Sequence, residues 1–210
     1  MKDYQAYLFD FHGTLFDTFY SLTFVYKYAF GKVGMDCTPE QTAVFMHISV
    51  QETCDRLGIH DLEKRQAILQ GVHDALDFPD NLSKIRIYPD VLETLEALKK
   101  AGKIVGVVSG NTEKHIGLVL EACHLTKEFA FVVGNSPDRK PKPSGDPIFE
   151  AKKHLAGLKD SEIVYVGDSL QDPETAHNGG VDGILLERKG EYPSYEGVKI
   201  TTLKALISAK

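Results

Sequence analysis

The sequence has little cysteine, with only three among 210 residues. Cys37, Cys54 and Cys123 are far apart, and they form neither a CxxC pair nor a Cys/His spacing typical of zinc sites. An odd number of scattered cysteines favours reduced thiols in a cytoplasmic protein. A chain of this length also buries enough surface to fold without cross-links. We therefore expect neither disulfides nor zinc.

Long hydrophobic runs are absent as well. No apolar stretch approaches the roughly 20 residues that a membrane span requires. The amino terminus, MKDYQAYLFDF, carries acidic residues where a secretory signal would have its apolar segment. Hydrophobic residues make up 42% and charged residues 26%, as in soluble globular proteins. These features predict a cytoplasmic protein with no membrane partner.

The sequence also lacks an excess of positive charge. It has 24 basic and 30 acidic side chains, which gives a net charge of −6. Nonspecific binding of nucleic acid depends on clustered lysine and arginine, so we expect no nucleic-acid partner. No repeat and no low-complexity tract is present. Composition leaves a monomer and a homodimer equally open.

The first third of the chain contains one strand followed by helical patterns. Residues 4–10 (YQAYLFD) are short and β-prone, and residues 18–86 contain three helical stretches without a convincing strand. In the second stretch, Thr38 is a helix cap and Pro39 occupies the first helical position, with Gln41 completing a capping pattern. This region predicts a helical insertion after the first strand.

After Pro89 the predicted elements alternate. Helices are expected at 91–102, 113–125, 147–158 and 173–180, and strands at 103–110, 128–134, 162–168 and 181–187. Such alternation indicates βαβ units and a mostly parallel sheet. The sequence therefore predicts an α/β fold with a doubly wound, Rossmann-like core over 1–17 and 88–210. A helical cap domain is expected over 18–87.

Polar residues follow four of the predicted strands. In an open parallel sheet, reactive groups gather beyond the carboxyl ends of the strands. The four segments found there are Asp10-Phe11-His12-Gly13-Thr14, Ser109-Gly110-Asn111, Lys140-Pro141-Lys142-Pro143 and Gly167-Asp168-Ser169-Leu170-Gln171-Asp172.

These residue types fit the transfer of a phosphoryl group. Carboxylates at one sheet edge hold a hard cation such as Mg²⁺, while lysine and serine bind the remaining phosphoryl oxygens. A carboxylate can also attack phosphorus and form an aspartyl phosphate. Gly13 and Gly110 would let backbone amides approach the anion closely.

The four segments, in this order, resemble the haloacid dehalogenase superfamily of phosphohydrolases. Its pattern is DxDGT, a strand ending in Ser or Thr, KP, and GDxxxD. The helical insertion is similar to the small cap of the phosphoglycolate phosphatase and β-phosphoglucomutase branch. The resemblance implies a magnesium-dependent phosphatase that acts on a small phosphorylated metabolite.

The resemblance also implies roles for individual residues. Asp10 would be the nucleophile, and Ser109 and Lys140 would bind the transferring phosphoryl group. Gly110 and Asn111, next to Ser109, would complete the phosphate site.

The magnesium ligands implied by the resemblance are Asp10, Asp168 and the backbone carbonyl of His12. Asp172 would hold a metal-bound water or orient Lys140.

His12 is a departure from the family pattern, which has an aspartate at this position as general acid and base. Loss of such a group costs about 10²–10⁴-fold in rate. A neutral histidine can act as base for water but is a poor acid for the leaving alcohol. Three interpretations follow: an enzyme that uses His12, a slow or leaving-group-selective enzyme, and a weakened homologue that binds phosphorylated ligands.

Other functions fit the residues less well. A receiver domain carries its phosphorylated aspartate in mid-sheet, whereas Asp10 lies on the first strand. A sugar-phosphate mutase needs an acid and base at position 12, and cleavage of a C–P bond needs a cap lysine that we cannot identify. Within the insertion, His47 and Arg56 are candidate substrate contacts.

Overall fold

The computed structural model describes residues 2–46 and 48–207 of the chain. These residues form two compact units, here called the core unit (Met1–Phe16 with Ile87–Lys210) and the helical unit (Asp17–Arg86). The boundaries expected from the sequence, 17/18 and 87/88, lie one residue from this division. Both places where the chain passes between the units fall in short strands, β2 (Phe16–Asp17) and β3 (Arg86–Ile87), which pair with each other.

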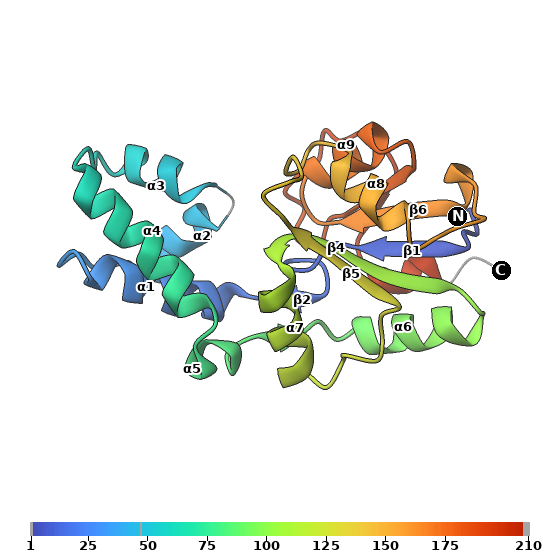
Figure 1. The fold of residues 1–210 in the computed structure, drawn as a ribbon, viewed down its shortest axis with the longest axis horizontal. Helices are drawn as coiled ribbons and strands as arrows, with labels where there is room; N and C mark the ends of the chain where they lie inside the picture. Colours follow the sequence, from blue (N-terminus) through green and yellow to red (C-terminus); the bar gives the residue numbers. More distant parts are fainter. Residues whose placement is uncertain (1, 47, 208–210) are drawn as a thin grey trace. The chain divides into compact units, whose positions relative to one another are not determined.

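A six-stranded parallel sheet forms the centre of the core unit (Figure 1). Its strands, in spatial order, are β5 (Phe131–Asn135), β4 (Ile104–Thr112), β1 (Ala6–Phe9), β6 (Ile163–Gly167), β7 (Asp182–Leu186) and β8 (Lys199–Ile200). β1 lies between β4 and β6, and every residue of β1 is buried. A strand covered on both faces reads as a continuous apolar run, which is how AYLF appears in the sequence.

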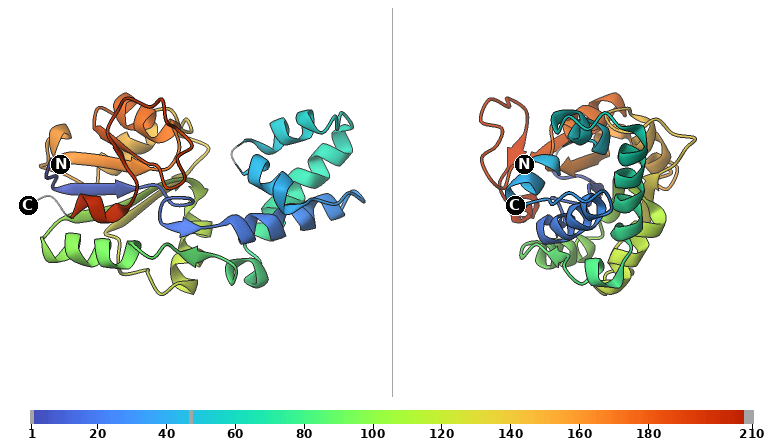
Figure 2. Two further views of the ribbon diagram at one scale, coloured as in Figure 1. Left: turned by 180° about the vertical axis from the view of Figure 1, so that it is seen from behind. Right: turned by 90° about the vertical axis from the view of Figure 1, so that its left-hand side faces the viewer.

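Helices cover both faces of this sheet, as the two opposite views show (Figures 1 and 2). They are α6 (Val91–Lys100), α7 (Glu113–Ala122), α8 (Asp146–Lys152) and α9 (Gln171–Asn178), with short 3₁₀ turns at Asp160–Glu162 and Leu203–Leu206. On one face Ile148 of α8 and Ala176 of α9 pack in one cluster with Leu8 and Tyr165 of the sheet. The predicted doubly wound α/β fold is confirmed.

The described residues of the helical unit form five helices. They are α1 (Phe19–Gly31), α2 (Pro39–Phe45), α3 (Val50–Arg56), α4 (Leu62–Leu76) and α5 (Pro79–Leu82). α1 and α4 approach closely at Gly71, where an added Cβ would lie 2.8 Å from the Cα of Ala29. The expected cap at Thr38 is present, with Gln41 completing the reciprocal hydrogen bonds.

One expected helix of this unit is divided in two. The sequence pattern predicted a single helix from Thr38 to Gly58, but α2 ends at Phe45 and α3 begins at Val50. The cause is Ser49, whose side chain accepts a hydrogen bond from the backbone N–H of Glu52 and so starts a new helix. His47 lies in this break and outside the described residues.

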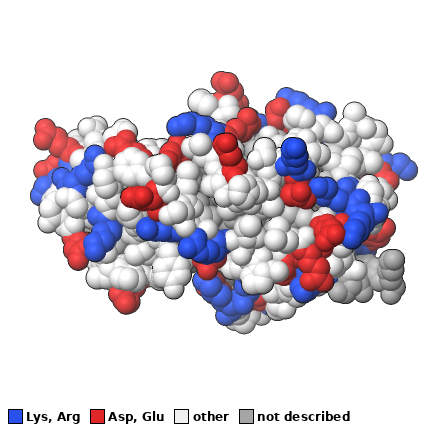
Figure 3. All heavy atoms as spheres, turned by 90° about the horizontal axis from the view of Figure 1, so that it is seen from below, with Lys and Arg blue, Asp and Glu red and all other residues white. Residues whose placement is uncertain are grey.

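The three cysteines and the charged surface residues can be placed in the structure. Cys37, Cys54 and Cys123 are free thiols, the first two buried in the helical unit. Basic and acidic side chains are interspersed over the face shown in Figure 3. None of the described helices has both the length and the apolar composition that a bilayer span needs.

Candidate active site

Three central strands of the core unit bring the predicted polar residues to one edge of the sheet. Phe9 of β1 is in register with Val107 of β4 and Val166 of β6, and all three strands run parallel. Extended by one residue, this register sets Asp10 beside Val108 and Gly167, which directly precede Ser109 and Asp168. This edge is the carboxyl end of the sheet, where open α/β folds bind their ligands.

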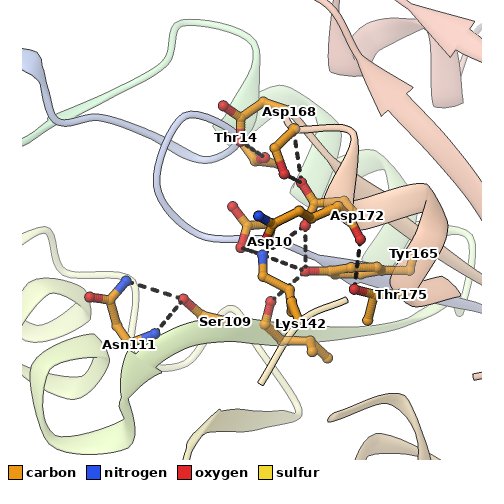
Figure 4. Close-up of polar contacts among 12 residues, drawn as sticks. Asp10, Thr14, Ser109, Asn111, Lys142, Tyr165, Asp168, Asp172 and Thr175 are labelled. Atoms are coloured by element: carbon orange, nitrogen blue, oxygen red, sulfur yellow. Dashed lines mark hydrogen bonds and ion pairs between the residues drawn. The ribbon is translucent and has the colours of Figure 1, made fainter. Parts of the chain in front are cut away.

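Three carboxylates meet at this edge (Figure 4). Oxygens of Asp10, Asp168 and Asp172 lie within 4.8 Å of one another. Asp10 and Asp172 are buried, and Asp168 is partly buried. The structure thus brings together the three carboxylates that the sequence analysis assigned to a metal site.

The lysine at this cluster is Lys142. Its Nζ lies 2.8 Å from Oδ1 of Asp10 and 2.7 Å from Oδ1 of Asp172. The expected phosphate-binding residue, Lys140, is exposed, and its backbone N–H donates to Asp146. The placement of Lys140 at the site was therefore wrong, and Lys142 takes that place.

The local fold explains which lysine reaches the carboxylates. The carbonyl of Pro143 accepts a hydrogen bond of 2.8 Å from Nδ2 of Asn178, at the end of α9. At Gly145 an added Cβ would lie 2.4 Å from the carbonyl oxygen of Asn178, so this loop packs directly on α9. Lys142 adjoins the anchored segment, whereas Lys140 precedes it. The sequence contains two Lys-Pro pairs and does not by itself show which is anchored.

Asp172 uses both carboxylate oxygens within the protein. Oδ1 accepts from Lys142 and pairs at 3.1 Å with the hydroxyl of Tyr165, while Oδ2 accepts from the backbone and hydroxyl of Ser169. Such a carboxylate orients its neighbours better than it ligates a metal directly. Of the two roles expected for Asp172, the geometry favours orienting a lysine, here Lys142.

Tyr165 is a member of the site that sequence reasoning missed. Its hydroxyl contacts the carbonyl of Val108, Asp172 and Nζ of Lys142, at 2.9, 3.1 and 3.3 Å. The side chain is fully buried beneath the site. A tyrosine in an otherwise aliphatic buried strand, two residues before the GDxxxD glycine, is the signal that was available, since a buried hydroxyl needs polar partners.

Two glycines occupy positions where the carboxylates need their space. An added Cβ on Gly13 would lie 2.0 Å from Oδ2 of Asp168, and one on Gly167 would lie 2.2 Å from Cγ of Asp172. Gly13 also has a φ of +80°, which side-chain-bearing residues rarely adopt. By contrast, an added Cβ on Gly110 would meet no protein atom within 4 Å.

The cluster holds more negative than positive charge. Burial raises the pKa of Asp10 to about 6, with Asp172 adding to the rise and Lys142 opposing it. Burial and the two neighbouring carboxylates raise the pKa of Asp168 to about 7. Burial alone would lower the pKa of Lys142, but Asp10 and Asp172 together raise it.

This electrostatic balance fits a divalent cation. Three carboxylates face one lysine, and oxygen donors of this kind are the ligands that Mg²⁺ prefers. Asp168 accepts one hydrogen bond among the described residues, 3.0 Å from the hydroxyl of Thr14, which leaves its other oxygen available. The residues present therefore fit the metal that the sequence resemblance implies.

The loop that carries Asp10 is held by a buried ion pair. Arg188 forms two hydrogen bonds of 3.0 Å with Asp90 and donates a third, of 2.9 Å, to the carbonyl of Thr14. Its guanidinium also lies 4.0 Å from the ring centre of Tyr88. Arg188 thus fixes the residue that in turn contacts Asp168.

Ser109 and Asn111 lie beside the carboxylates on β4 (Figure 4). The hydroxyl of Ser109, which is buried, accepts hydrogen bonds from the backbone and the side chain of Asn111. Because that oxygen already accepts, its own proton can be donated to an incoming anion.

His12 presents an imidazole without a hydrogen bond at Nδ1. This atom is buried and has no partner among the described residues. The ring centre lies 5.1 Å from that of Phe11 and 5.4 Å from that of His115. Burial lowers the pKa of His12 to about 3, helped by the proximity of His115 and Lys142. The side chain is therefore neutral at physiological pH.

The two expected substrate contacts of the helical unit, His47 and Arg56, stay predictions. Arg56 forms an ion pair of 2.8 Å with Glu52 on its own helix, and both side chains are about half exposed. His47 lies outside the described residues.

Comparison with known proteins identifies the family of this chain. The model of the haloacid dehalogenase-like hydrolases matches residues 7–186. A phosphoglycolate phosphatase of Mannheimia succiniciproducens is 34% identical over 110 residues, which cover 52% of this chain and 49% of that protein. The haloacid dehalogenase-like hydrolase domain-containing protein 3 of Danio rerio is 30% identical over 142 residues, covering 67% and 56%. The chain spans about half the length of these curated relatives.

Solved structures agree in fold. A hydrolase of the haloacid dehalogenase-like family from Streptococcus pneumoniae superposes with a TM-score of 0.81 at 17% identity, covering 98% of both chains. Because the family model matches residues 7–186, the chain belongs to the haloacid dehalogenase-like hydrolases.

Proposed function

We propose that this protein is a magnesium-dependent phosphatase that hydrolyses a small phosphorylated metabolite through an aspartyl phosphate. The observation that carries the proposal is the buried Asp10 at the carboxyl end of the central strand, beside two carboxylates and Lys142. The family relation and the phosphoglycolate phosphatase among the relatives support a phosphate monoester as substrate.

Asp10, Asp168 and the backbone carbonyl of His12 would hold the metal, with Asp172 acting through Lys142. Bound Mg²⁺ supplies positive charge that offsets the carboxylates and polarises the phosphoryl oxygens.

In the first step an oxygen of Asp10 attacks phosphorus in line. The new bond joins Asp10 to the phosphoryl group, and the bond from phosphorus to the alcohol oxygen breaks. Lys142 and the hydroxyl of Ser109 stabilise charge on the phosphoryl oxygens. The departing oxygen takes its proton from water, because neutral His12 is a poor acid.

In the second step water attacks the phosphorus of the aspartyl phosphate. His12 or solvent accepts a proton from this water, although the low pKa of His12 makes the imidazole a weak base, and Asp10 is released with inorganic phosphate. Since the first step lacks a strong acid, we expect substrates with good leaving groups to react fastest. A homologue that binds phosphorylated ligands with little turnover is the alternative that His12 keeps open.

The proposal is tested by phosphate release from phosphorylated metabolites and from an aryl phosphate, with Mg²⁺ and with EDTA. We expect turnover with Mg²⁺ and its loss in EDTA and in Asp10→Asn. The matched control is Asp138→Asn, which removes the same charge from an exposed loop residue. Turnover that persists in Asp10→Asn would refute the mechanism, and silence of the wild type with every substrate would favour the binding role.

A further inference from the structure

The helical unit contains a hollow of about 500 Å³ that the proposed reaction does not use. It is lined by Tyr20, Thr23, Phe24 and Lys27 of α1 and by Lys84 and Arg86, which follow α5. All six residues belong to the helical unit, and none belongs to the carboxylate cluster. A volume of this size is within the range that small organic ligands occupy.

The three basic residues of this hollow lack acidic partners. Within the described part of the chain, neither Lys27, Lys84 nor Arg86 forms an ion pair with a carboxylate. Other basic residues of the same unit do so: Lys32, Arg56 and Arg65 pair with Asp74, Glu52 and Asp55. In a protein with a net charge of −6, three cations without partners around one hollow are a local excess of positive charge.

The walls of the hollow are aromatic. Nζ of Lys84 lies 5.2 Å from the ring centre of Phe24, and Tyr20 is 66% exposed. The hydroxyl of Thr23 already donates to the carbonyl of Phe19, so it offers little polarity to the cavity. Arg86 donates from one guanidinium nitrogen to the carbonyls of Ser83 and Ile85, which holds the group in place with other donors free.

We propose that this hollow binds a small aromatic anion. The ring of such a ligand would stack on Phe24 and Tyr20, while its phosphate or carboxylate would be bound by Lys27, Lys84 and Arg86. The basic residues favour an anion, and the aromatic walls favour a ring. An inorganic ion would contact only the basic residues and should therefore bind more weakly.

The test is calorimetric titration of the intact protein with naphthalene-1-sulfonate, which is an aromatic anion that a phosphatase cannot hydrolyse. EDTA is present, so that the three carboxylates of the core unit carry no metal and repel anions. We expect one binding site, and at least a roughly tenfold weaker affinity in the double variant Lys27→Ala/Lys84→Ala, equivalent to about 1.4 kcal/mol. Phe24→Leu should weaken binding as well.

The matched control is Lys64→Ala. Lys64 is an exposed lysine of the same unit that does not line the hollow, so its removal should leave the affinity unchanged. The neutral analogue 1-naphthalenemethanol should bind at least roughly tenfold more weakly than the sulfonate. Naphthyl phosphonate and naphthyl carboxylate, titrated in the same way, distinguish a phosphate ester from a carboxylic acid as the preferred class.

Equal affinity in the wild type and the double variant would overturn the proposal, as would equal affinity for the neutral analogue. Because the readout is binding and not turnover, the result is independent of whether the protein proves to be a phosphatase. Phe24, Lys27 and Lys84 line the hollow and Lys64 is exposed, and thermal melting of each variant checks that folding is preserved.

Discussion

The two units of this protein differ in where they place charge. In the core unit Asp10, Asp172 and Lys142 are removed from water and held by one another, and a second buried pair lies at Asp90 and Arg188. In the helical unit ion pairs such as Arg56 with Glu52 stay at the surface. A buried charge contributes to function because its surroundings cannot reorganise, whereas an exposed one is screened by water. Substitutions at these buried charges of the core unit should therefore have large effects, and substitutions at exposed pairs small ones.

The largest effect is expected at the lysine pair that the sequence could not resolve. Lys142→Ala removes the charge that faces Asp10 and Asp172 and should lower the rate of phosphate release by about 10²–10³-fold, as loss of a transition-state donor does. Lys140→Ala, two residues away and exposed, should be close to wild type. Steady-state kinetics of both variants test this difference. Equal losses of rate would contradict the assignment of Lys142 to the site.

The second effect concerns stability. Arg188→Met leaves Asp90 buried without its partner and should lower the free energy of unfolding at pH 7 by about 3 kcal/mol. Burial raises the pKa of Asp90, but hydrogen bonds from Arg188, Thr202 and the Leu203 amide outweigh it, so the net shift is downward.

The sign of the pH dependence follows from that downward shift. The folded state holds the Asp90 proton less tightly than the unfolded chain, so this contribution to stability is present above the ordinary pKa of 3.8. It is lost as the pH falls below 3.8 through the lower folded value. Urea unfolding at several pH values should show the gap between wild type and Arg188→Met narrowing in that acid range. A gap that widens there would contradict the assignment.

The third effect tests the neutral imidazole at the site. His12→Asp supplies a carboxyl group at the position where the family carries its acid and base, and such a group contributes about 10²–10⁴-fold. Hydrolysis of an alkyl phosphate should therefore rise, by at least about tenfold, while hydrolysis of an aryl phosphate should rise less. Measuring both substrates in both proteins is sufficient. An equal rise for both esters would show that leaving-group protonation is not what His12 limits.

The smallest effect is expected in the helical unit. Arg56→Ala breaks an exposed pair within one helix and should lower the free energy of unfolding by no more than about 0.5 kcal/mol. Thermal unfolding at low and high salt checks this value. A loss as large as that of Arg188→Met would remove the contrast between the two units.

The sequence was sufficient for those parts of the site that follow directly from strand ends. Because the central strands are parallel and in register, any polar residue immediately after each apolar run must reach the same edge, which places Asp10, Ser109 and Asp168 together. The alternation after Pro89 likewise determined the doubly wound fold.

What the sequence could not predict depends on contacts between distant segments. The sequence could not show whether Lys140 or Lys142 reaches the carboxylates, because that depends on the hydrogen bond from Asn178 to the carbonyl of Pro143. In the sequence Tyr165 resembles an ordinary core residue, and only the structure shows that its hydroxyl contacts Asp172. The break at Ser49 was missed because the helical pattern on both sides is continuous.

The central position of β1 has a consequence for how the chain folds during synthesis. β1 leaves the ribosome well before its partners β4 and β6, which begin at Ile104 and Ile163. The helical unit, contiguous from Asp17 to Arg86, is complete before either partner exists. Contacts of such long sequence separation form slowly. β1 therefore stays unpaired until β4 and β6 have been synthesised, and during that interval its exposed AYLF run is prone to aggregate.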